Sequence, residues 1–363
     1  MRILDNLKMK ASNSKEYMQG EEYIDEIINA INPEWTNIQK IAYIDNCIGK
    51  KISYNPMFGT EMENKDEERT LWKILSAGYG VCNGIAQVEN YILERIGIKG
   101  EIVSGKSHTF IKLKSIELPQ KDGNSMVGDT ILDPTWNLSA QRFGARPRNF
   151  CLSYEEIRKN DIDENGKDQE CHKNDEKLES ASIGLDEECL REIYRQIGIA
   201  DEKGEFPIKK IYNESEKIYK LGLNSSEYLP RILNLLQENY PDFVHSVNET
   251  TSILYGLLDN ENFKYEKCVI KRVYKREDKG KMANLYVYAD FGKDGRVFYV
   301  ADKETGKFIE LSQKEFEEKY ECYQADLDRS GGIRPWESTE KTVETNNLAQ
   351  SSGKVVACEG EER

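Results

Sequence analysis

The sequence predicts an α+β protein: a helix beginning at Cys82 packs on an antiparallel sheet, and a helical subdomain and a small antiparallel β meander follow. Three observations predict this fold. Apolar residues recur at helical spacing through 21–50 and again from Cys82 to Gly97. Short strand-like runs follow between 101 and 136. Beyond 265 the pattern changes to short β-branched and aromatic runs separated by turns that contain glycine.

The first elements are helical. We expect helices over 21–31 and 35–50, separated by Pro33, and a third over 66–77. The helix that begins at Cys82 carries an apolar stripe, which we interpret as its core face: Ile85, Val88, Ile92 and Ile96. Gly97 and Gly100 end this helix and turn the chain. Strands are expected over 101–104, 108–115 and 127–136. A helix on an antiparallel sheet is therefore the predicted core, over residues 15–158.

The chain changes character after the core. Residues 159–182 are rich in Asp, Glu, Lys and Asn, which predicts an exposed polar linker. A helical subdomain is expected over 183–259, with Asp186 as a helix cap, and a β-rich subdomain over 260–325. In the latter, Ser312 with Glu315 has the pattern of a capping box. Residues 326–363 have the composition of a disordered tail.

Composition limits the partners. The chain of 363 residues has 51 Lys and Arg against 65 Asp and Glu, a net charge of −14, which disfavours nucleic acid. It has no apolar run long enough to span a membrane and no secretory signal at its N-terminus, so we expect a cytoplasmic protein. The eight cysteines form no C-x-x-C pair, and Cys171 beside His172 lacks ligand spacing, so neither a metal nor another cofactor is expected.

The residues that suggest chemistry are Cys82, His108 and Asp133. Cys82 lies in Gly80-Val81-Cys82-Asn83-Gly84, at a helix N-terminus, where the helix dipole and a nearby imidazolium lower a thiol pKa. His108 begins a strand-like run and could act as the base, with Asp133 orienting its ring. The other histidines are less suitable, because His172 falls in the polar linker and His245 in a helical run outside the core.

At these residues the sequence resembles the transglutaminase-like superfamily of papain-fold thiol enzymes. Roughly residues 20–158 match its pattern: a G-x-C-x-G-x-A helix start at Cys82, a later strand led by His108, and an Asp-x-Thr-Trp segment at Asp133. Ile52-Ser53-Tyr54 resembles the end of the family's leading segment. The resemblance implies Cys82 as nucleophile, His108 as base and Asp133 as orienting acid. The backbone N–H of Cys82 is the expected first oxyanion donor, and Trp72 or Tyr54 is a candidate for the second.

The sequence thus predicts acyl transfer at an amide or peptide bond of a protein or peptide substrate through a thioester at Cys82. Hydrolysis is preferred because water is always present and no amine pocket is evident. Transamidation and deamidation are the first alternative. The second is a non-catalytic binding or scaffold protein on the same fold, because a fold alone does not determine function. The oligomeric state is left open.

Overall fold

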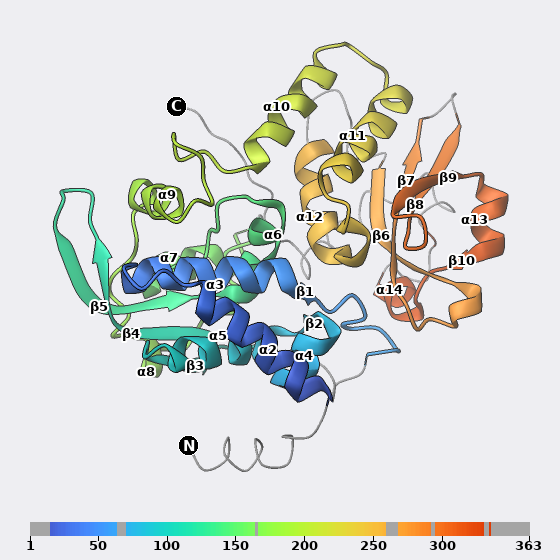
Figure 1. The fold of residues 1–363 in the computed structure, drawn as a ribbon. Coiled ribbons are helices and arrows are strands. Elements are labelled where there is room, and N and C mark those ends of the chain that lie inside the picture. The colour runs from blue at the N-terminus through green and yellow to red at the C-terminus, as the bar shows by residue number, and fades with distance from the viewer. Residues whose placement is uncertain are drawn as a thin grey trace. The chain divides into compact units, whose positions relative to one another are not determined.

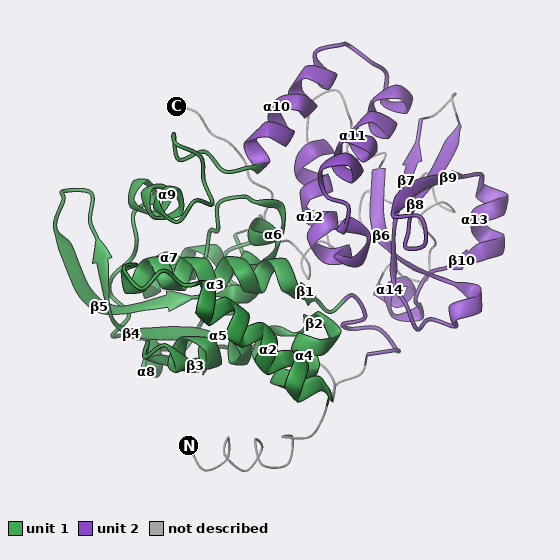
Figure 2. Ribbon diagram, in the orientation of Figure 1, with its two compact units in different colours: residues 1–55, 65–207 green, residues 56–64, 208–363 purple. Residues whose placement is uncertain are grey.

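The computed structural model describes residues 15–63, 70–163, 166–258, 268–291 and 295–329, together with Arg334. The chain forms two compact units (Figure 2). One comprises residues 1–55 and 65–207, and the other comprises residues 56–64 and 208–363. Both units mix helices with antiparallel sheets, which confirms the α+β class (Figure 1).

The first unit contains most of the helices, in an order close to the prediction. Its elements are α2 (Lys15–Ala30), α3 (Asn37–Lys51), β1 (Ser53–Tyr54), α4 (Leu71–Ala77), β2 (Tyr79–Gly80), α5 (Cys82–Arg95), β3 (Gly100–Ser104), β4 (Thr109–Pro119), β5 (Ser125–Leu132), α6 (Pro134–Phe143), α7 (Tyr154–Asn160), α8 (Asp175–Leu178) and α9 (Glu187–Gln196). The first six of these elements precede the three-stranded sheet β3-β4-β5, and helix α5 begins at Cys82, where the sequence predicts.

The core of the first unit lies between α5 and a three-stranded antiparallel sheet of order β3-β4-β5. The predicted stripe of α5 is buried at Ile85, Val88 and Ile92, while Ile96 caps the end of the helix and is half-buried. Each fully buried side chain of this kind contributes about 1.5–3 kcal/mol. Helix α3 packs on α5 and α6, so that α5 is covered by helices as well as by the sheet. This packing fixes the N-terminus of α5 against the start of β4.

Among the described residues, the second unit has five α-helices, two 3-10 helices and a five-stranded antiparallel sheet. Its elements are α10 (Ile208–Tyr219), α11 (Ser225–Asn239), η1 (Phe243–His245), α12 (Val247–Leu258), β6 (Cys268–Lys275), η3 (Arg276–Asp278), β7 (Asn284–Asp290), β8 (Arg296–Asp302), β9 (Lys307–Leu311), α13 (Gln313–Lys319), β10 (Tyr320–Glu321) and α14 (Gln324–Arg329). The strand order β10-β6-β7-β8-β9 contains the predicted meander, and the Ser312 capping box with Glu315 is present. Aromatic side chains that include Tyr286 and Phe298 fill its core.

Hydrogen bonds connect the helical region of the second unit to its β-rich region. Gln237 of α11 accepts a hydrogen bond from the Phe308 backbone at 3.0 Å, and Tyr255 of α12 donates to the Ile270 carbonyl at 3.3 Å. These bonds join the helices to the sheet within one unit. Helix α9, which we expected in the helical subdomain, instead packs on α3 of the first unit. Its predicted cap, Asp186, does accept from the Glu188 backbone.

Part of the predicted tail is helical, because residues 326–329 lie in α14. Asp326 forms a two-pronged ion pair with Arg272 of β6, which attaches α14 to the sheet. The rest of the predicted tail, apart from Arg334, lies outside the described residues.

Candidate active site

Cys82 occupies the first position of α5, where the preceding backbone is held by a short parallel strand pair. β1 pairs with β2, with Ser53 opposite Tyr79 and Tyr54 opposite Gly80. Gly78, with φ of 76°, ends α4 in the left-handed region that glycine adopts readily, so the chain turns directly into β2. Val81 precedes the helix in extended conformation and offers no side-chain cap. The first N–H groups of α5 therefore have no side-chain cap, and they point towards the end of the helix at which Cys82 stands.

His108 stands one residue before β4, at the end of a tight turn from β3. The turn is closed by the Gly105 N–H, which donates to the His108 carbonyl at 2.9 Å, and Ser104 pairs with Thr109 in the β3–β4 ladder. The His108 side chain is 8% exposed. The His108 side chain and the Thr109 backbone N–H both lower the pKa of the Cys82 thiol, so both lie near its sulfur. The β3–β4 hairpin thus presents the ring to the helix N-terminus.

Asp133, the N-cap of α6, completes a row of three side chains with Cys82 and His108. The sequence predicts a strand over 127–136, but β5 ends at Leu132 and α6 begins at Pro134. A proline at the first helical position is typical of a helix start, because its ring favours helical φ and it has no N–H to satisfy. Asp133 Oδ1 accepts from the backbone N–H groups of Thr135 at 3.1 Å and Trp136 at 3.2 Å. Its Oδ2 lies 2.7 Å from His108 Nε2.

The charges of these three groups reinforce one another. Burial alone would raise the pKa of the Cys82 thiol, but the hydrogen bond and positive charge of His108 lower it below the ordinary value. Burial would lower the pKa of His108, yet the charge of Asp133 and its hydrogen bond raise that pKa to about 10. The pKa of Asp133 is lowered, because the His108 cation and hydrogen bonds outweigh its burial. These shifts favour a thiolate, an imidazolium and a carboxylate.

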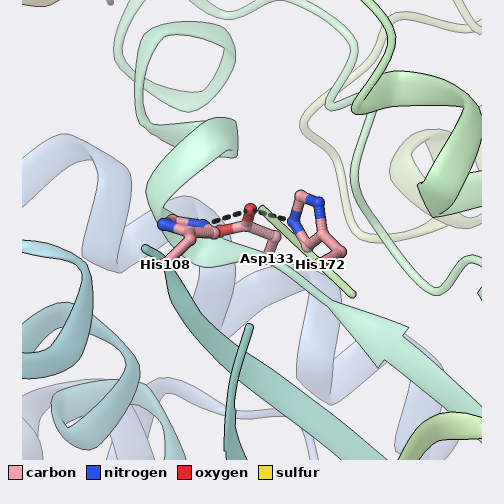
Figure 3. Close-up of side chains that lie close together, drawn as sticks. All are labelled: His108, Asp133 and His172. Atoms are coloured by element: carbon pink, nitrogen blue, oxygen red, sulfur yellow. Dashed lines mark hydrogen bonds and ion pairs between the residues drawn. The ribbon is translucent and has the colours of Figure 1, made fainter. Parts of the chain in front are cut away.

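His172 is part of the same row, which the sequence analysis missed. Figure 3 shows Asp133 between two imidazole rings, with His172 Nε2 2.9 Å from the same Oδ2 that His108 contacts. Its Nδ1 lies 2.6 Å from Asp161 Oδ1, and its backbone N–H donates to Asp161 Oδ2 at 2.9 Å. The His172 side chain is fully buried. His172 is therefore not in an exposed linker, contrary to the expectation from the polar composition around it.

The segment around His172 packs onto the first unit in several places. Leu178 of α8 and Ala181 are buried against the β3–β4–β5 sheet in one apolar cluster with Phe110. The Lys106 ammonium pairs with Glu170 at 2.7 Å, and the Asn174 amide donates to the Ser104 carbonyl at 2.9 Å. Only a few apolar side chains of this segment are buried, and polar side chains make its other contacts. Its composition therefore suggests an exposed linker although the segment is packed on the first unit.

Aromatic rings shield the row from water. The Trp136 ring lies 5.5 Å from the His108 ring and 4.7 Å from the His172 ring, between centroids. Phe110 covers His172 from another side, at 4.8 Å. In such low-dielectric surroundings hydrogen bonds between charged groups are stronger than in water. The sequence placed Trp136 in a strand, and only its position in the first turn of α6 brings it over both histidines.

His108, Asp133 and His172 are the one group in the described parts of the chain with donor types and spacing compatible with a metal ion. Asp133 Oδ2 lies at hydrogen-bonding distance from both ring nitrogens, 2.7 Å and 2.9 Å. A hydrogen-bonded N–H has no lone pair to offer a metal. We therefore assign the group as a hydrogen-bond network.

The two candidates for a second oxyanion donor lie in different places. Tyr54 is in β1, opposite Gly80, two residues before Cys82. Trp72 instead packs between Tyr17 of α2 and Tyr91 of α5. Tyr91 is nine positions after Cys82, about 13.5 Å along a helix. Tyr54 is thus the better placed of the two.

Two further carboxyl groups are buried behind the site. Asp45 of α3 accepts hydrogen bonds from the amides of Asn137 and Gln141, and burial raises its pKa to about 8. Glu89 of α5 is fully buried, and neither of its oxygens has a hydrogen-bond partner among the described residues. Burial, then the charge of Asp45, raises the pKa of Glu89 well above its ordinary value. Neutral carboxyl groups are the expected state of both at neutral pH.

Comparison with known proteins adds no assignment: no protein-family model matches the chain, and no curated protein matches it. Within the described residues, no helix combines the length and the apolar content that crossing a bilayer requires.

Proposed function

We propose that this protein is a thiol enzyme with a transglutaminase-like core, which acts on an amide or peptide bond through a thioester at Cys82. The observation that carries the proposal is the His108–Asp133 pair, 2.7 Å apart, close to a thiol at the N-terminus of α5 whose pKa the His108 side chain lowers. The pKa of each group is shifted in the direction that acyl transfer requires. A buried cysteine with a purely structural role would not need an imidazole that is itself held by a carboxylate.

The first half of the cycle forms the thioester. The Cys82 thiolate attacks the amide carbonyl carbon, and the carbonyl oxygen becomes an oxyanion. The N–H groups at the start of α5, beginning with that of Cys82, and the Tyr54 hydroxyl are the proposed donors to it. The C–N bond then breaks as the His108 imidazolium gives its proton to the leaving amine. Asp133 keeps the ring oriented and stabilises the imidazolium before transfer.

The second half releases the acyl group. Neutral His108 accepts a proton from water as the water oxygen attacks the thioester carbonyl, and the Cys82 thiolate leaves. Hydrolysis of a protein or peptide is the proposed net reaction. An amine in place of water gives transamidation, and a side-chain amide as substrate gives deamidation.

The proposal is tested with a mixed peptide library incubated with the enzyme in ¹⁸O-labelled water, with and without a primary amine. Hydrolysis places ¹⁸O in a new C-terminal carboxylate, deamidation places it in a side-chain carboxylate, and transamidation adds the mass of the amine. Cys82→Ala should abolish every product, and Cys189→Ala, which removes a half-buried thiol on α9, should abolish none. Products that persist in Cys82→Ala would refute the role of Cys82.

The rival from another class is a binding or scaffold protein that keeps the fold without catalysis. It predicts no labelled product with wild type and a Cys82 thiol no more reactive than the other cysteines. Alkylation of the thiol with iodoacetamide separates the two proposals even where the peptide library lacks the right substrate.

A further inference from the structure

His172 bonds a carboxylate with each of its ring nitrogens. Nε2 lies 2.9 Å from Asp133 Oδ2, and Nδ1 lies 2.6 Å from Asp161 Oδ1. All three side chains are 0% exposed, so water does not compete for these bonds. Proposed catalysis by Cys82 and His108 does not require a second ring on Asp133, and the arrangement therefore needs a separate explanation.

Counting protons gives the state of His172. A neutral imidazole has one N–H and one acceptor nitrogen, whereas an ionised carboxylate can only accept. Asp133 is ionised, since it receives two backbone N–H groups, His108 and His172. Asp161 receives the His172 backbone N–H and forms an ion pair with Arg158. Two carboxylates on one ring require protons on both of its nitrogens.

The charges then alternate along one row. From the helix N-terminus outwards the groups are the Cys82 thiolate, the His108 imidazolium, the Asp133 carboxylate, the His172 imidazolium, the Asp161 carboxylate and the Arg158 guanidinium, which also pairs with Asp168. Each buried charge in this row has a neighbour of opposite sign, which is the condition under which buried charges are tolerated.

We infer that His172 is a permanently protonated positioning residue, which Asp161 holds in place and which acts on His108 through Asp133. This inference rests on the proposed function for its catalytic consequence. The His172 cation shares the Asp133 carboxylate with His108, and the two rings lie 5.3 Å apart between centroids. It therefore offsets part of the stabilisation that Asp133 gives to the His108 cation. His108 becomes a stronger acid, better able to protonate a leaving amine.

The groups that act on His172 come from four parts of the first unit. Asp133 at the start of α6 and Asp161 after α7 stabilise its cation, and His108 before β4 opposes it. Arg158 of α7 acts through Asp161. Burial opposes the cation, but the hydrogen bonds to the two carboxylates outweigh it and raise the pKa of His172.

The direct test is nitrogen NMR of the full chain labelled with ¹⁵N histidine. The chain has three histidines, so single variants assign every ring signal. We expect both ring nitrogens of His172 to carry protons from about pH 6 to about pH 8, a range in which an ordinary histidine with pKa of about 6.5 loses one. A neutral His172 in this range would overturn the inference.

Two variants test the effect on His108. His172→Gln removes the cation, and Asp161→Asn keeps the shape of the side chain while removing the charge that holds His172 protonated. In both, the His108 titration should move to higher pH, by about one unit or more in His172→Gln, given a like charge at this distance. Asp168→Asn is the matched control, because it removes the other carboxylate on Arg158 and should leave His108 unchanged. An unchanged His108 titration in both folded test variants would overturn the inference.

The same proteins are alkylated with iodoacetamide to separate this inference from the proposed function. An unreactive Cys82 in wild type refutes the proposed function, whatever the state of His172. With a reactive Cys82, loss of one cation should move the pH midpoint of its alkylation upwards in His172→Gln, by less than the shift at His108 because the sulfur is farther away. A reactive Cys82 with an identical midpoint in His172→Gln and in Asp161→Asn refutes the positioning role and leaves the proposed function standing.

Discussion

Replacing Asp133 with asparagine isolates the charge of the orienting residue. Asparagine is as good an N-cap as aspartate, so Asp133→Asn can keep the bonds from Thr135 and Trp136 that start α6. It removes the negative charge that lies 2.7 Å from His108 Nε2. We therefore expect a folded protein with an altered site, whereas alanine at this position would also remove the cap.

The size of the effect follows from the pKa of His108. The value of about 10 exceeds an ordinary histidine pKa by about 3.5 units, or about 5 kcal/mol. Asp133 is the main source of this increase, and without it burial leaves His108 neutral at about pH 7. Cys82 then behaves as an ordinary or buried thiol, with a pKa of about 8.5 or more and a few per cent of thiolate or less at about pH 7.

Alkylation of Cys82 by iodoacetamide measures this change. Relative to a fully formed ion pair, the rate in Asp133→Asn should fall about 30- to 100-fold at about pH 7, and the difference should largely disappear at about pH 10. Asp129→Asn, four residues earlier on β5, removes a carboxylate that contacts Ser115 and Ser180 and should leave the rate unchanged. Equal rates in wild type and folded Asp133→Asn at about pH 7 would refute the role of Asp133.

Three further predictions concern stability and turnover. The pKa of His108 is raised in the folded protein, so its charge stabilises the fold fully below an ordinary pKa of about 6.5, and this contribution is lost as the pH rises through about 10. In urea unfolding, the difference in unfolding free energy between wild type and His108→Gln should therefore decrease over that pH range. A difference that increases with pH would contradict this prediction. The buried Glu89 carboxyl group has a raised pKa, so it destabilises the folded protein at pH values above its ordinary pKa of about 4.3. Glu89→Met should therefore raise the urea midpoint of unfolding, and by more as the pH increases. A lower midpoint in this variant would show that the carboxyl group has a hydrogen-bond partner. Tyr54→Phe should lower amide turnover in the ¹⁸O assay but leave the rate of Cys82 alkylation unchanged, because the Tyr54 hydroxyl is proposed to donate a hydrogen bond to the oxyanion and not to the thiolate. Unchanged turnover in this variant would show that Tyr54 is not an oxyanion donor.

Much of the first unit could be predicted because its signals are local. The apolar stripe of α5 and the glycine-containing turn before Cys82 act over a few residues, as does the alternation that predicts the strand after His108. The three proposed catalytic residues each stand at the beginning of a helix or strand, where glycine, proline and capping residues give local signals. Asp133 was assigned to a strand, although Pro134 directly after it is a helix-start signal.

The contribution of His172 could not be predicted from local pattern. It lies 39 residues from Asp133 in sequence and within a segment of polar composition. Its burial depends on contacts such as that between Asn174 and the Ser104 carbonyl, which no periodicity records. Local pattern also does not record the packing of α9 on α3, which are more than a hundred residues apart in the sequence. The one available signal was that the chain has only three histidines, which makes each of them a candidate for a role in the site.

The central claim is that Cys82 and His108 form a thiolate–imidazolium pair. The most direct test is iodoacetamide alkylation across pH, followed at each of the eight cysteines by peptide mapping, in wild type and His108→Ala. The account predicts that Cys82 alone reacts rapidly below the ordinary thiol pKa of about 8.5, and that His108→Ala removes this advantage. A Cys82 that reacts no faster than the other cysteines in wild type, or equally fast without His108, would contradict it.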